Sequence, residues 1–333
     1  MNSKNRVKLR PVLDGDSWMI GDNPDLGELN STGTKRQECV DHYIFQTDDG
    51  IWHLWGCIRG TANGRVLYHW ESGDITAAHW TQTGEYFRVD KTAGESLLDW
   101  DDEEWIQSPF VIRENGKFYM FYGGHTTGID ESGCAVEEGF GELSRLVCEV
   151  ACQMCLMTSD DGRNWTRHKN QAGFSRLFIG PGEARDPALI KIDGLWHMYY
   201  AGCHFTNGDQ GVPAFYVRTS EDLIHWSGWR VVHSDTNPKF GSERWNHECP
   251  MVVERGGYYY LFRTQEYGTA STHVFRSEDP FDFGIGDAAD KYVGSIAVAA
   301  PEIIFDADGR EYISSSHDLA GGTRLCKLKW IEE

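Results

Sequence analysis

Residues 186–201 read DPALIKIDGLWHMYYA, and four other stretches of the chain follow the same pattern. They are DHYIFQTDDGIWHLWG at 41–56, SPFVIRENGKFYMFYG at 108–123, ECPMVVERGGYYYLFR at 248–263 and PEIIFDADGREYIS at 301–314. Each copy joins an apolar strand to a second, mostly aromatic strand through a turn that contains glycine. A hairpin this small cannot bury its own apolar face, so the five copies must pack against one another.

The repeats predict the fold class. Beyond its hairpin the pattern continues into a third strand, such as 214–220, and in several repeats into a fourth, such as 229–233. Four strands repeated five times predict an all-β, five-bladed β-propeller, whereas a β-sandwich gives no reason for five matched openings. We expect a single propeller domain over residues 38–333, without a C-terminal β-sandwich. Residues 1–37 are expected to be an N-terminal lead-in packed on the propeller.

Composition narrows the class of partner. The formal net charge is −20, and a chain of this charge repels the phosphates of nucleic acids. No stretch is long and apolar enough to cross a bilayer, so no membrane partner is expected. The polar first ten residues lack the apolar core of a secretory signal. The nine cysteines are scattered, and several lie on predicted strands, at Cys57, Cys152, Cys155, Cys203 and Cys326. This pattern indicates reduced thiols and a cytoplasmic protein of undetermined oligomeric state.

Three of the five repeats open on an acidic residue, namely Asp41, Asp186 and Glu248. A single acid before a strand is most often a turn residue. In a propeller, however, the first strand of each blade lines the central channel, and equivalent strand starts face the same mouth. Proline follows Asp186 directly and Glu248 after one residue, which suits the first position of a strand. Three acids at equivalent positions should therefore converge at one end of the channel.

Converging carboxyl groups suit the cleavage of a glycosidic bond. One carboxylate must be ionised, as nucleophile or as base for water, and one carboxyl group must keep a proton for the leaving oxygen. Crowding raises the pKa of one member of such a set, because like charges at close range cannot all ionise. A third acid can stabilise the charge that develops on the sugar. This chemistry requires no cofactor.

The motifs around these acids resemble those of the five-bladed propeller glycoside hydrolases. That superfamily holds the β-fructofuranosidases (family 32) and the arabinanases and xylosidases (family 43). Asp186 lies in an Arg-Asp-Pro motif and Glu248 in a Glu-Cys-Pro motif, as in the fructofuranosidases. Asp41 holds the blade-one position, flanked by Val and His instead of Asn and Pro, and Asp22 in an Asp-Asn-Pro sequence is its rival. The resemblance implies that Asp41 is the nucleophile or base, Asp186 the transition-state stabiliser and Glu248 the acid/base.

The resemblance implies a hydrolase that acts on a furanoside or a short oligosaccharide. The two matched motifs favour retention of the anomeric configuration, as in the fructofuranosidases. The bare propeller instead favours an inverting arabinofuranosidase- or xylosidase-like hydrolase. Two further alternatives stay open. One is a glycoside phosphorylase or transferase, whose phosphate could bind to Arg36, Arg185 or Arg263, and the other is a non-catalytic carbohydrate-binding propeller.

Other residues near the blade openings are candidates for binding the sugar. They are His42, Ser108, Arg185, Trp105, Trp245 and His317. Glu183 and Glu302 also lie near blade starts and are alternates for the acids. Cys152 and Cys155 have an odd spacing on a predicted strand, which points them to opposite faces, so no zinc site is expected. A structural Ca²⁺ ion in the channel is the one metal that the resemblance leaves open.

Overall fold

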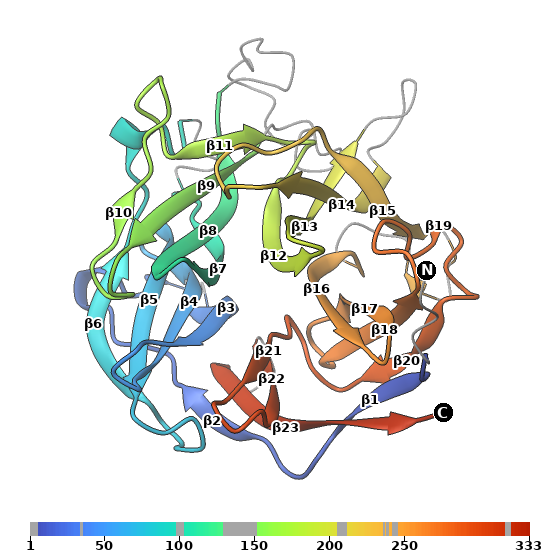
Figure 1. Cartoon of the computed structure of the whole chain (residues 1–333). Helices are drawn as coiled ribbons and strands as arrows, with labels where there is room; N and C mark the ends of the chain where they lie inside the picture. The colour runs from blue at the N-terminus through green and yellow to red at the C-terminus, as the bar shows by residue number, and fades with distance from the viewer. Residues whose placement is uncertain are drawn as a thin grey trace.

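Five sheets stand around a common axis in the computed structural model (Figure 1). The structure describes residues 6–33, 36–97, 103–128, 152–204, 212–235, 237, 240–241, 246–316 and 321–333. The first strand of each blade lies next to the axis, so the protein is a five-bladed β-propeller and the predicted fold class is confirmed. Two 3₁₀ turns lie wholly within these ranges, η1 (Gly27–Leu29) and η2 (Lys91–Ala93). Within the same ranges, no helix has the length and apolar character needed to span a membrane.

Blades one to four follow the order of the sequence. Blade one contains β3 (Glu38–Gln46), β4 (Trp52–Thr61), β5 (Gly64–Ser72) and β6 (Thr81–Phe87). Blade two contains β7 (Gln107–Glu114), β8 (Lys117–Thr126), β9 (Cys152–Ser159), β10 (Thr166–Arg167) and β11 (Arg176–Ile179). Blade three contains β12 (Arg185–Ile192), β13 (Leu195–His204), β14 (Val212–Ser220) and β15 (Arg230–Asp235). Blade four contains β16 (Glu248–Arg255), β17 (Tyr258–Glu266), β18 (Ser271–Ser277) and β20 (Tyr292–Ile296), while β19 (Ile285–Gly286) leaves blade four to pair with β15.

Blade five joins the two ends of the chain. It contains β21 (Ile303–Phe305), β22 (Glu311–Ser316) and β23 (Thr323–Glu332), and both β1 (Leu9–Leu13) and β2 (Trp18–Gly21) pair with β23. β1 runs antiparallel to β23, with Leu9 opposite Glu332 and Leu13 opposite Leu328. Strands of the lead-in, before residue 38, thus complete the fifth blade. Without them the outer edge of β23 would have no partner.

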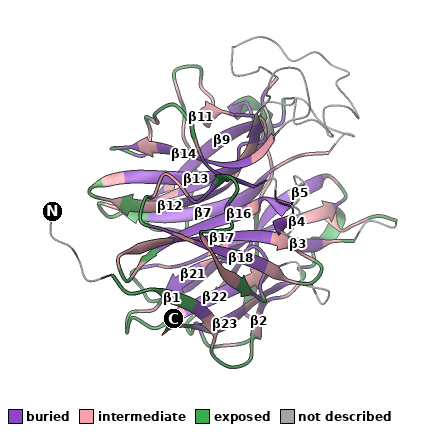
Figure 2. Cartoon of the chain, turned by 90° about the vertical axis from the view of Figure 1, so that its right-hand side faces the viewer, coloured by how far each residue is buried: buried purple, intermediate pink, exposed green. Residues whose placement is uncertain are grey.

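The strands of the blades are largely buried (Figure 2), and apolar side chains from different blades belong to common buried clusters. One buried cluster includes Phe110 of blade two, Met198 of blade three and Phe262 of blade four. A second joins the ends of the ring, with Trp70 of blade one and Leu325 of blade five among its members. The aromatic strands of the hairpins therefore serve mainly as inter-blade packing, which explains why each repeat depends on its neighbours.

The cysteines do not all carry free thiols. Six described cysteines are free and buried: Cys39, Cys57, Cys152, Cys155, Cys249 and Cys326. Cys203 on β13 is disulfide-bonded, and none of these six is its partner. The expectation of reduced thiols is therefore wrong at Cys203.

Removal of residues 1–13 should lower the thermal unfolding midpoint by about 5 °C or more. The deletion takes away the five residue pairs between β1 and β23, and backbone hydrogen bonds contribute about 0.5–1.5 kcal/mol each. For a chain of 333 residues, 1 kcal/mol shifts the midpoint by roughly 1–2 °C. Calorimetry checks the value, with removal of residues 1–5 as the control. Equal midpoints for the two truncations would show that β1 does not stabilise the ring.

Candidate active site

The predicted acids stand at bulges in the inner strands. In blades one to four, the pairing of the first two strands shifts between Cys39 and His42, Gln107 and Phe110, Arg185 and Ala188, and Glu248 and Met251. At each shift two residues of the inner strand lie opposite one residue of its neighbour, and such a bulge bends the strand and re-aims its side chains. Residues in or directly before the four bulges line one cavity at the mouth of the channel: Val40, Asp41, Gln107, Arg185 and Glu248.

The bulges hold an uncommon backbone conformation. Ser108, Asp186 and Cys249 have φ angles of 54°, 56° and 51°, in the left-handed region. A non-glycine residue there costs about 1–3 kcal/mol, so the surrounding structure must fix it. Each of the three precedes a proline, which lacks an N–H group and loses no ladder hydrogen bond in a bulge. The backbone at these three residues is therefore strained, and it fixes the direction in which their side chains point.

The three acids do not hold equivalent positions. Asp186 is the first bulged residue of its strand, Asp41 is the second, and Glu248 precedes its bulge. The expected equivalence is therefore wrong: relative to Asp186, Asp41 lies one position later in its strand and Glu248 one position earlier. The pattern of hairpins does not reveal where each bulge falls. The three side chains nevertheless lie in one network, which Ser108 and Arg185 connect.

Ser108 connects Asp41 to Asp186. Its Oγ lies 3.0 Å from Asp41 Oδ2 and 2.6 Å from Asp186 Oδ1. A hydroxyl carries one proton, so it donates to one carboxylate at a time, and the other contact is favourable only when that carboxyl group is protonated. Burial raises the pKa of Asp186, against the opposing charge of Arg185 and with a further rise from Asp41. The hydroxyl of Ser108 therefore couples the two carboxyl groups, because it can donate to only one of them when both are ionised.

Arg185 connects Asp186 to Glu248. Its guanidinium donates to Asp186 Oδ2, to Glu248 Oε1 at 2.9 Å and to Glu183 Oε2 at 3.1 Å. One positive charge cannot neutralise three carboxylates together with the nearby Asp41. Burial raises the pKa of Glu248 to about 7, and the charges of Asp186 and Asp41 add to the rise while Arg185 opposes it. Glu248 therefore keeps its proton into the neutral range.

Two cavities divide the acids. The mouth cavity has a volume of about 240 Å³, and its lining includes Asp41, Glu183, Arg185, Glu248, Trp105 and Tyr267. A space of about 10 Å³, the axial cavity, lies deeper, and its lining includes Asp41, His42, Ser108, Asp186, Cys249 and Glu302. Asp41 faces both spaces, whereas Asp186 lines only the axial cavity and Glu248 only the mouth cavity. A molecule in the mouth cavity would therefore meet Asp41, Glu248 and Glu183, but not Asp186.

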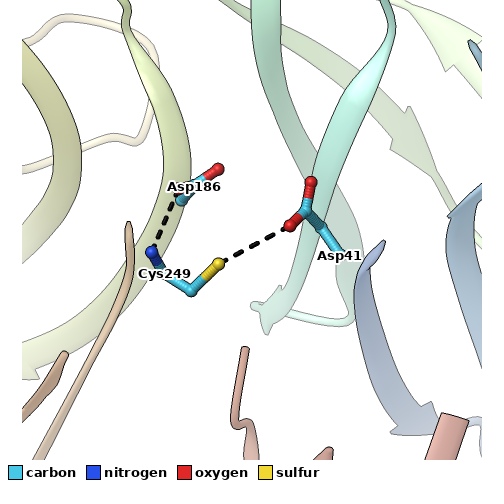
Figure 3. A group of neighbouring side chains, drawn as sticks. All are labelled: Asp41, Asp186 and Cys249. Atoms are coloured by element: carbon cyan, nitrogen blue, oxygen red, sulfur yellow. Dashed lines mark hydrogen bonds between the residues drawn. The ribbon is translucent and has the colours of Figure 1, made fainter. Parts of the chain in front are cut away.

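The hydrogen bonds of Asp41 and Asp186 differ. Asp41 Oδ2 lies 3.0 Å from the Ser108 hydroxyl, which is closer to Asp186. Among the described residues, Asp41 Oδ1 has contacts of 3.5 Å with Cys249 Sγ (Figure 3) and with the hydroxyl of Tyr267. Asp186 is engaged on both oxygens, by Ser108 on Oδ1 and by Arg185 and the Cys249 amide, at 3.0 Å, on Oδ2. Asp41 therefore has the oxygen that is freer to interact with a substrate, and Asp186 is held in place.

The structure corrects the predicted role of His42. Its ring is buried, with Nε2 2.6 Å from Ser314 Oγ and Nδ1 2.6 Å from Ser316 Oγ. Burial lowers the pKa of His42 to about 4, so the imidazole is neutral at pH 7. It lines the axial cavity and not the mouth cavity. A sugar in the mouth cavity would not meet this side chain, which instead ties blade one to blade five.

The remaining predicted residues fall into three groups. Trp105, Arg185 and Glu183 line the mouth cavity. Ser108 lines the axial cavity and contacts Asp41 and Asp186 through its hydroxyl group. Trp245 and His317 lie outside the described residues. Asp22, the rival blade-one acid, pairs with His79 at 2.6 Å and lines neither cavity.

Glu302 is a neutral acid in the axial cavity. Burial of its carboxyl group, together with the charges of Asp41 and Asp186, raises its pKa well above the ordinary value. Its Oε2 atom has no hydrogen-bond partner among the described residues. An unpartnered buried oxygen is far less costly on a protonated carboxyl group than on a carboxylate. Glu302 therefore does not supply an ionised group for chemistry.

The residues around the axis are poorly suited to a metal ion. Ligand atoms of Asp41, Asp186 and Cys249 lie within 4.8 Å of one another. A thiol must be deprotonated to bind zinc, and burial raises the pKa of Cys249 well above its usual value. Ca²⁺ prefers six to eight oxygen ligands, whereas the axial cavity offers three carboxyl groups and one hydroxyl, with room for about one water molecule. These residues do not fit the structural calcium that the resemblance left open.

Several lining residues escaped the sequence analysis. Arg59, Arg65, Gln107 and Tyr267 all line the mouth cavity. Arg59 and Arg65 lie at the β4–β5 turn, and Tyr267 follows β17, so none of them belongs to an inner-strand opening. Gln107 directly precedes the Ser-Pro opening of blade two and could have been found by aligning it with Arg185.

Comparisons with known proteins were consistent with the fold. No protein-family model and no curated protein matches this sequence. Among solved structures, a thermostable family-43 glycoside hydrolase matches with a TM-score of 0.58 and 18% identity, over 92% of this chain and 93% of that chain. The GH43_1 enzyme from Xanthomonas citri complexed with xylotriose has a TM-score of 0.53 and 13% identity, over 89% and 87% of the two chains. The GH32 β-fructofuranosidase of Bombyx mori has a TM-score of 0.58 and 16% identity, over 91% of this chain and 63% of that chain. At these identities the likeness concerns the fold, which is that of the five-bladed propeller enzymes named by the motifs.

Glu302→Gln should match the wild type in stability at pH 4 and exceed it at pH 8. The folded pKa of Glu302 lies above its ordinary value of 4.5. The stability linked to this proton is therefore fully present below about pH 4.5 and is lost as pH rises toward the folded pKa. Glutamine, which has no proton to release, abolishes that loss. Chemical denaturation at the two pH values measures the effect, with the exposed Glu332→Gln as control. A variant destabilised equally at both values would contradict a neutral Glu302.

Proposed function

We propose that this protein is a glycoside hydrolase in which Glu248 is the general acid and Asp41 is the nucleophile or the base for water. The observation that carries the proposal is that Asp41 and Glu248 line the same mouth cavity. Of these two acids, Glu248 has a pKa that is raised to about 7. Glycoside cleavage needs one protonated and one ionised carboxyl group on the two sides of the bond. The propeller enzymes of families 43 and 32 that share this fold support the same reaction class.

Glu248 suits the general acid because its environment keeps a proton available. A group with a pKa near the working pH combines a useful protonated fraction with easy proton transfer. Its contact with Arg185, at 2.9 Å, limits the rise that burial causes and fixes the position of the carboxyl group. When the proton leaves, the same guanidinium stabilises the carboxylate, so Glu248 can also act as base in a later step.

Asp186 suits a supporting role. Both of its oxygens accept hydrogen bonds, and it lines only the axial cavity. In this position it directs Ser108 and Arg185, which in turn contact Asp41 and Glu248. Its negative charge also lies close enough to Glu248 to raise the pKa of that acid. We infer that Asp186 stabilises positive charge on the sugar in the transition state, as the motif resemblance implies.

The substrate that we propose is a furanoside or a short oligosaccharide. A cavity of about 240 Å³ lies below the range of roughly 300–1,000 Å³ that encloses drug-sized ligands, which favours one enclosed sugar unit. The motif resemblance favours a β-fructofuranosidase-like, retaining reaction. An inverting xylosidase- or arabinofuranosidase-like reaction is the alternative, supported by a neighbour whose structure holds xylotriose. The anomeric configuration of the first product, followed by NMR, distinguishes the two.

The phosphorylase alternative finds no support in the three arginines considered for it. Arg263 is fully buried and donates to the carbonyl of Phe240. Arg36 is half exposed beside Glu38, at 3.4 Å, and lines neither cavity. Arg185 already serves three carboxylates. A requirement for inorganic phosphate in turnover would nevertheless favour phosphorolysis, and no turnover on any glycoside would favour a binding propeller.

Asp41→Asn and Glu248→Gln should each lower kcat by at least about 10²–10⁴-fold, the range that positioned acid–base groups contribute. Asp186→Asn should also lower kcat, because it disturbs the partners of both groups. Turnover on a panel of oligosaccharides and aryl glycosides measures the effect. Glu254→Gln, at the exposed end of the same strand as Glu248, is the matched control and should keep full activity.

The leaving group separates the roles of Asp41 and Glu248. Dinitrophenolate leaves its glycoside without being protonated. With a dinitrophenyl glycoside as substrate, Glu248→Gln should therefore regain most of the wild-type activity, whereas Asp41→Asn should stay inactive. If Glu248→Gln keeps near wild-type activity on an unactivated oligosaccharide, Glu248 is not the acid.

The pH dependence of kcat/KM should show a falling limb near pH 7. Above that value Glu248, whose pKa is raised to about 7, loses the proton that the leaving oxygen requires, so activity decreases as pH rises. Initial rates between pH 4 and 9 give the profile. In Glu248→Gln the limb should be absent, and a limb that persists unchanged in this variant would assign it to another group.

A further inference from the structure

Arg65 is a cation of the mouth cavity whose partners among the described residues are neutral. Three arginines line this cavity, namely Arg59, Arg65 and Arg185. Carboxylates bind two of them, since Arg185 donates to its three acids and Arg59 pairs with Glu38 at 2.7 Å. Within the described ranges no carboxylate pairs with Arg65. Its positive charge therefore remains available to a molecule in the cavity.

The partners of Arg65 hold its guanidinium without neutralising it. The group lies over the ring of Trp105, at 4.2 Å from the centroid, and donates to Gln107 Oε1. It also contacts the thiol of Cys57, which burial keeps protonated by raising its pKa. An arginine stacked on an aromatic ring keeps its outward N–H groups for other acceptors.

The backbone around Arg65 is fixed to the segment that leads into blade two. The Arg65 amide donates to the carbonyl of Glu104 at 2.9 Å, and the Glu104 amide donates to the carbonyl of Asn63 at 2.8 Å. The carboxylate of Glu104 is itself bound by Arg88, at 2.9 Å from Nε, so it does not turn to Arg65. Gly124 leaves room for Gln107, because a Cβ atom there would lie 2.6 Å from Gln107 Cδ. A site whose groups are already ordered loses little entropy on binding.

We propose that Arg65 binds an anionic group of the substrate, a carboxylate or a phosphate carried by the sugar that occupies the mouth cavity. The inference rests on the proposed hydrolase function and specifies its substrate class. Arginine forms paired, charge-assisted hydrogen bonds with carboxylates and phosphates. Asp41, Glu183 and Glu248 make the rest of the cavity acidic, so an anionic sugar would be repelled in any orientation that did not place its charge on Arg65.

Binding to matched sugars that differ in charge tests the proposal. Isothermal titration of Glu248→Gln compares methyl glucoside with methyl glucuronide, methyl galactoside with methyl galacturonide, xylotriose with glucuronosyl-xylotriose, and fructose with fructose 6-phosphate. The anionic member of at least one pair should bind roughly 10–100-fold more tightly, as expected for a charge-assisted contact. The uronate pairs and the phosphate pair distinguish the two sources of the anion.

Substitution of Arg65 assigns the effect to this side chain. Adding Arg65→Gln should abolish the preference for the anionic sugar, and Arg65→Lys should retain part of it. Arg113→Gln is the matched control, since Arg113 also stacks on an aromatic ring, Phe118 at 5.1 Å, but lies outside the cavity. The control should keep the preference. If Arg65→Gln only disturbed the packing of Trp105, the affinities for neutral and anionic sugars would fall equally. The preference for the anionic sugar would then remain, so this effect is distinguishable from loss of the charge of Arg65.

The outcomes separate this inference from the hydrolase function. Equal affinity within every pair, no binding to any member, or a preference that survives Arg65→Gln would overturn the anionic subsite. Hydrolysis of neutral oligosaccharides by the wild-type protein in that case would leave the hydrolase function standing. An Arg65-dependent preference without turnover of any glycoside would support the subsite and contradict the hydrolase.

Discussion

One guanidinium group, that of Arg185, balances a cluster of carboxyl groups at the mouth of the propeller. It donates to Asp186, Glu248 and Glu183, and Asp41 lies one hydroxyl group away through Ser108. Because one positive charge cannot offset this many negative ones in a buried site, some of the acids must hold protons. Removing Arg185 would leave several buried charges without a partner, which is among the most destabilising changes a core can suffer. The electrostatic constraint thus creates the protonated acid that glycoside cleavage needs.

The bulges decide how this charge is distributed in space. Asp41, Asp186 and Glu248 come from three different positions relative to their bulges, and as a result they reach different depths. Asp186 faces only the axial cavity, whereas Asp41 and Glu248 reach the larger mouth cavity. A set of acids at truly equivalent positions would have formed a symmetric ring around the axis. The offset instead separates Asp186 from Asp41 and Glu248, which line the mouth cavity.

The blade-one and blade-two wall adds a different chemistry to the same cavity. There Arg65, Trp105 and Gln107 form a polar and aromatic surface without a carboxylate among the described contacts of Arg65. The three acids come from strand openings that the propeller repeats impose. In this wall, Arg65 lies at the start of β5 beside the β4–β5 turn, Trp105 lies in the segment before β7, and Gln107 begins β7. Connecting segments vary more freely than the strands they join. Substrate preference is therefore expected to reside in this wall, and the bond-breaking groups in the inner strands.

Hairpin periodicity was enough to predict the five blades and the convergence of Asp41, Asp186 and Glu248 near the axis, because strands and their openings are local features that repeat along the chain. It could not locate the bulges, since a one-residue shift leaves the hydrophobic pattern of the hairpin almost unchanged. It also missed that β1 and β2 close the fifth blade and that His42 is bound between Ser314 and Ser316, more than 270 residues away. Those contacts join the two ends of the chain, and the stacking of Arg65 on Trp105 likewise joins two blades. Only the closed ring decides them, because each depends on the packing of segments that no local pattern relates.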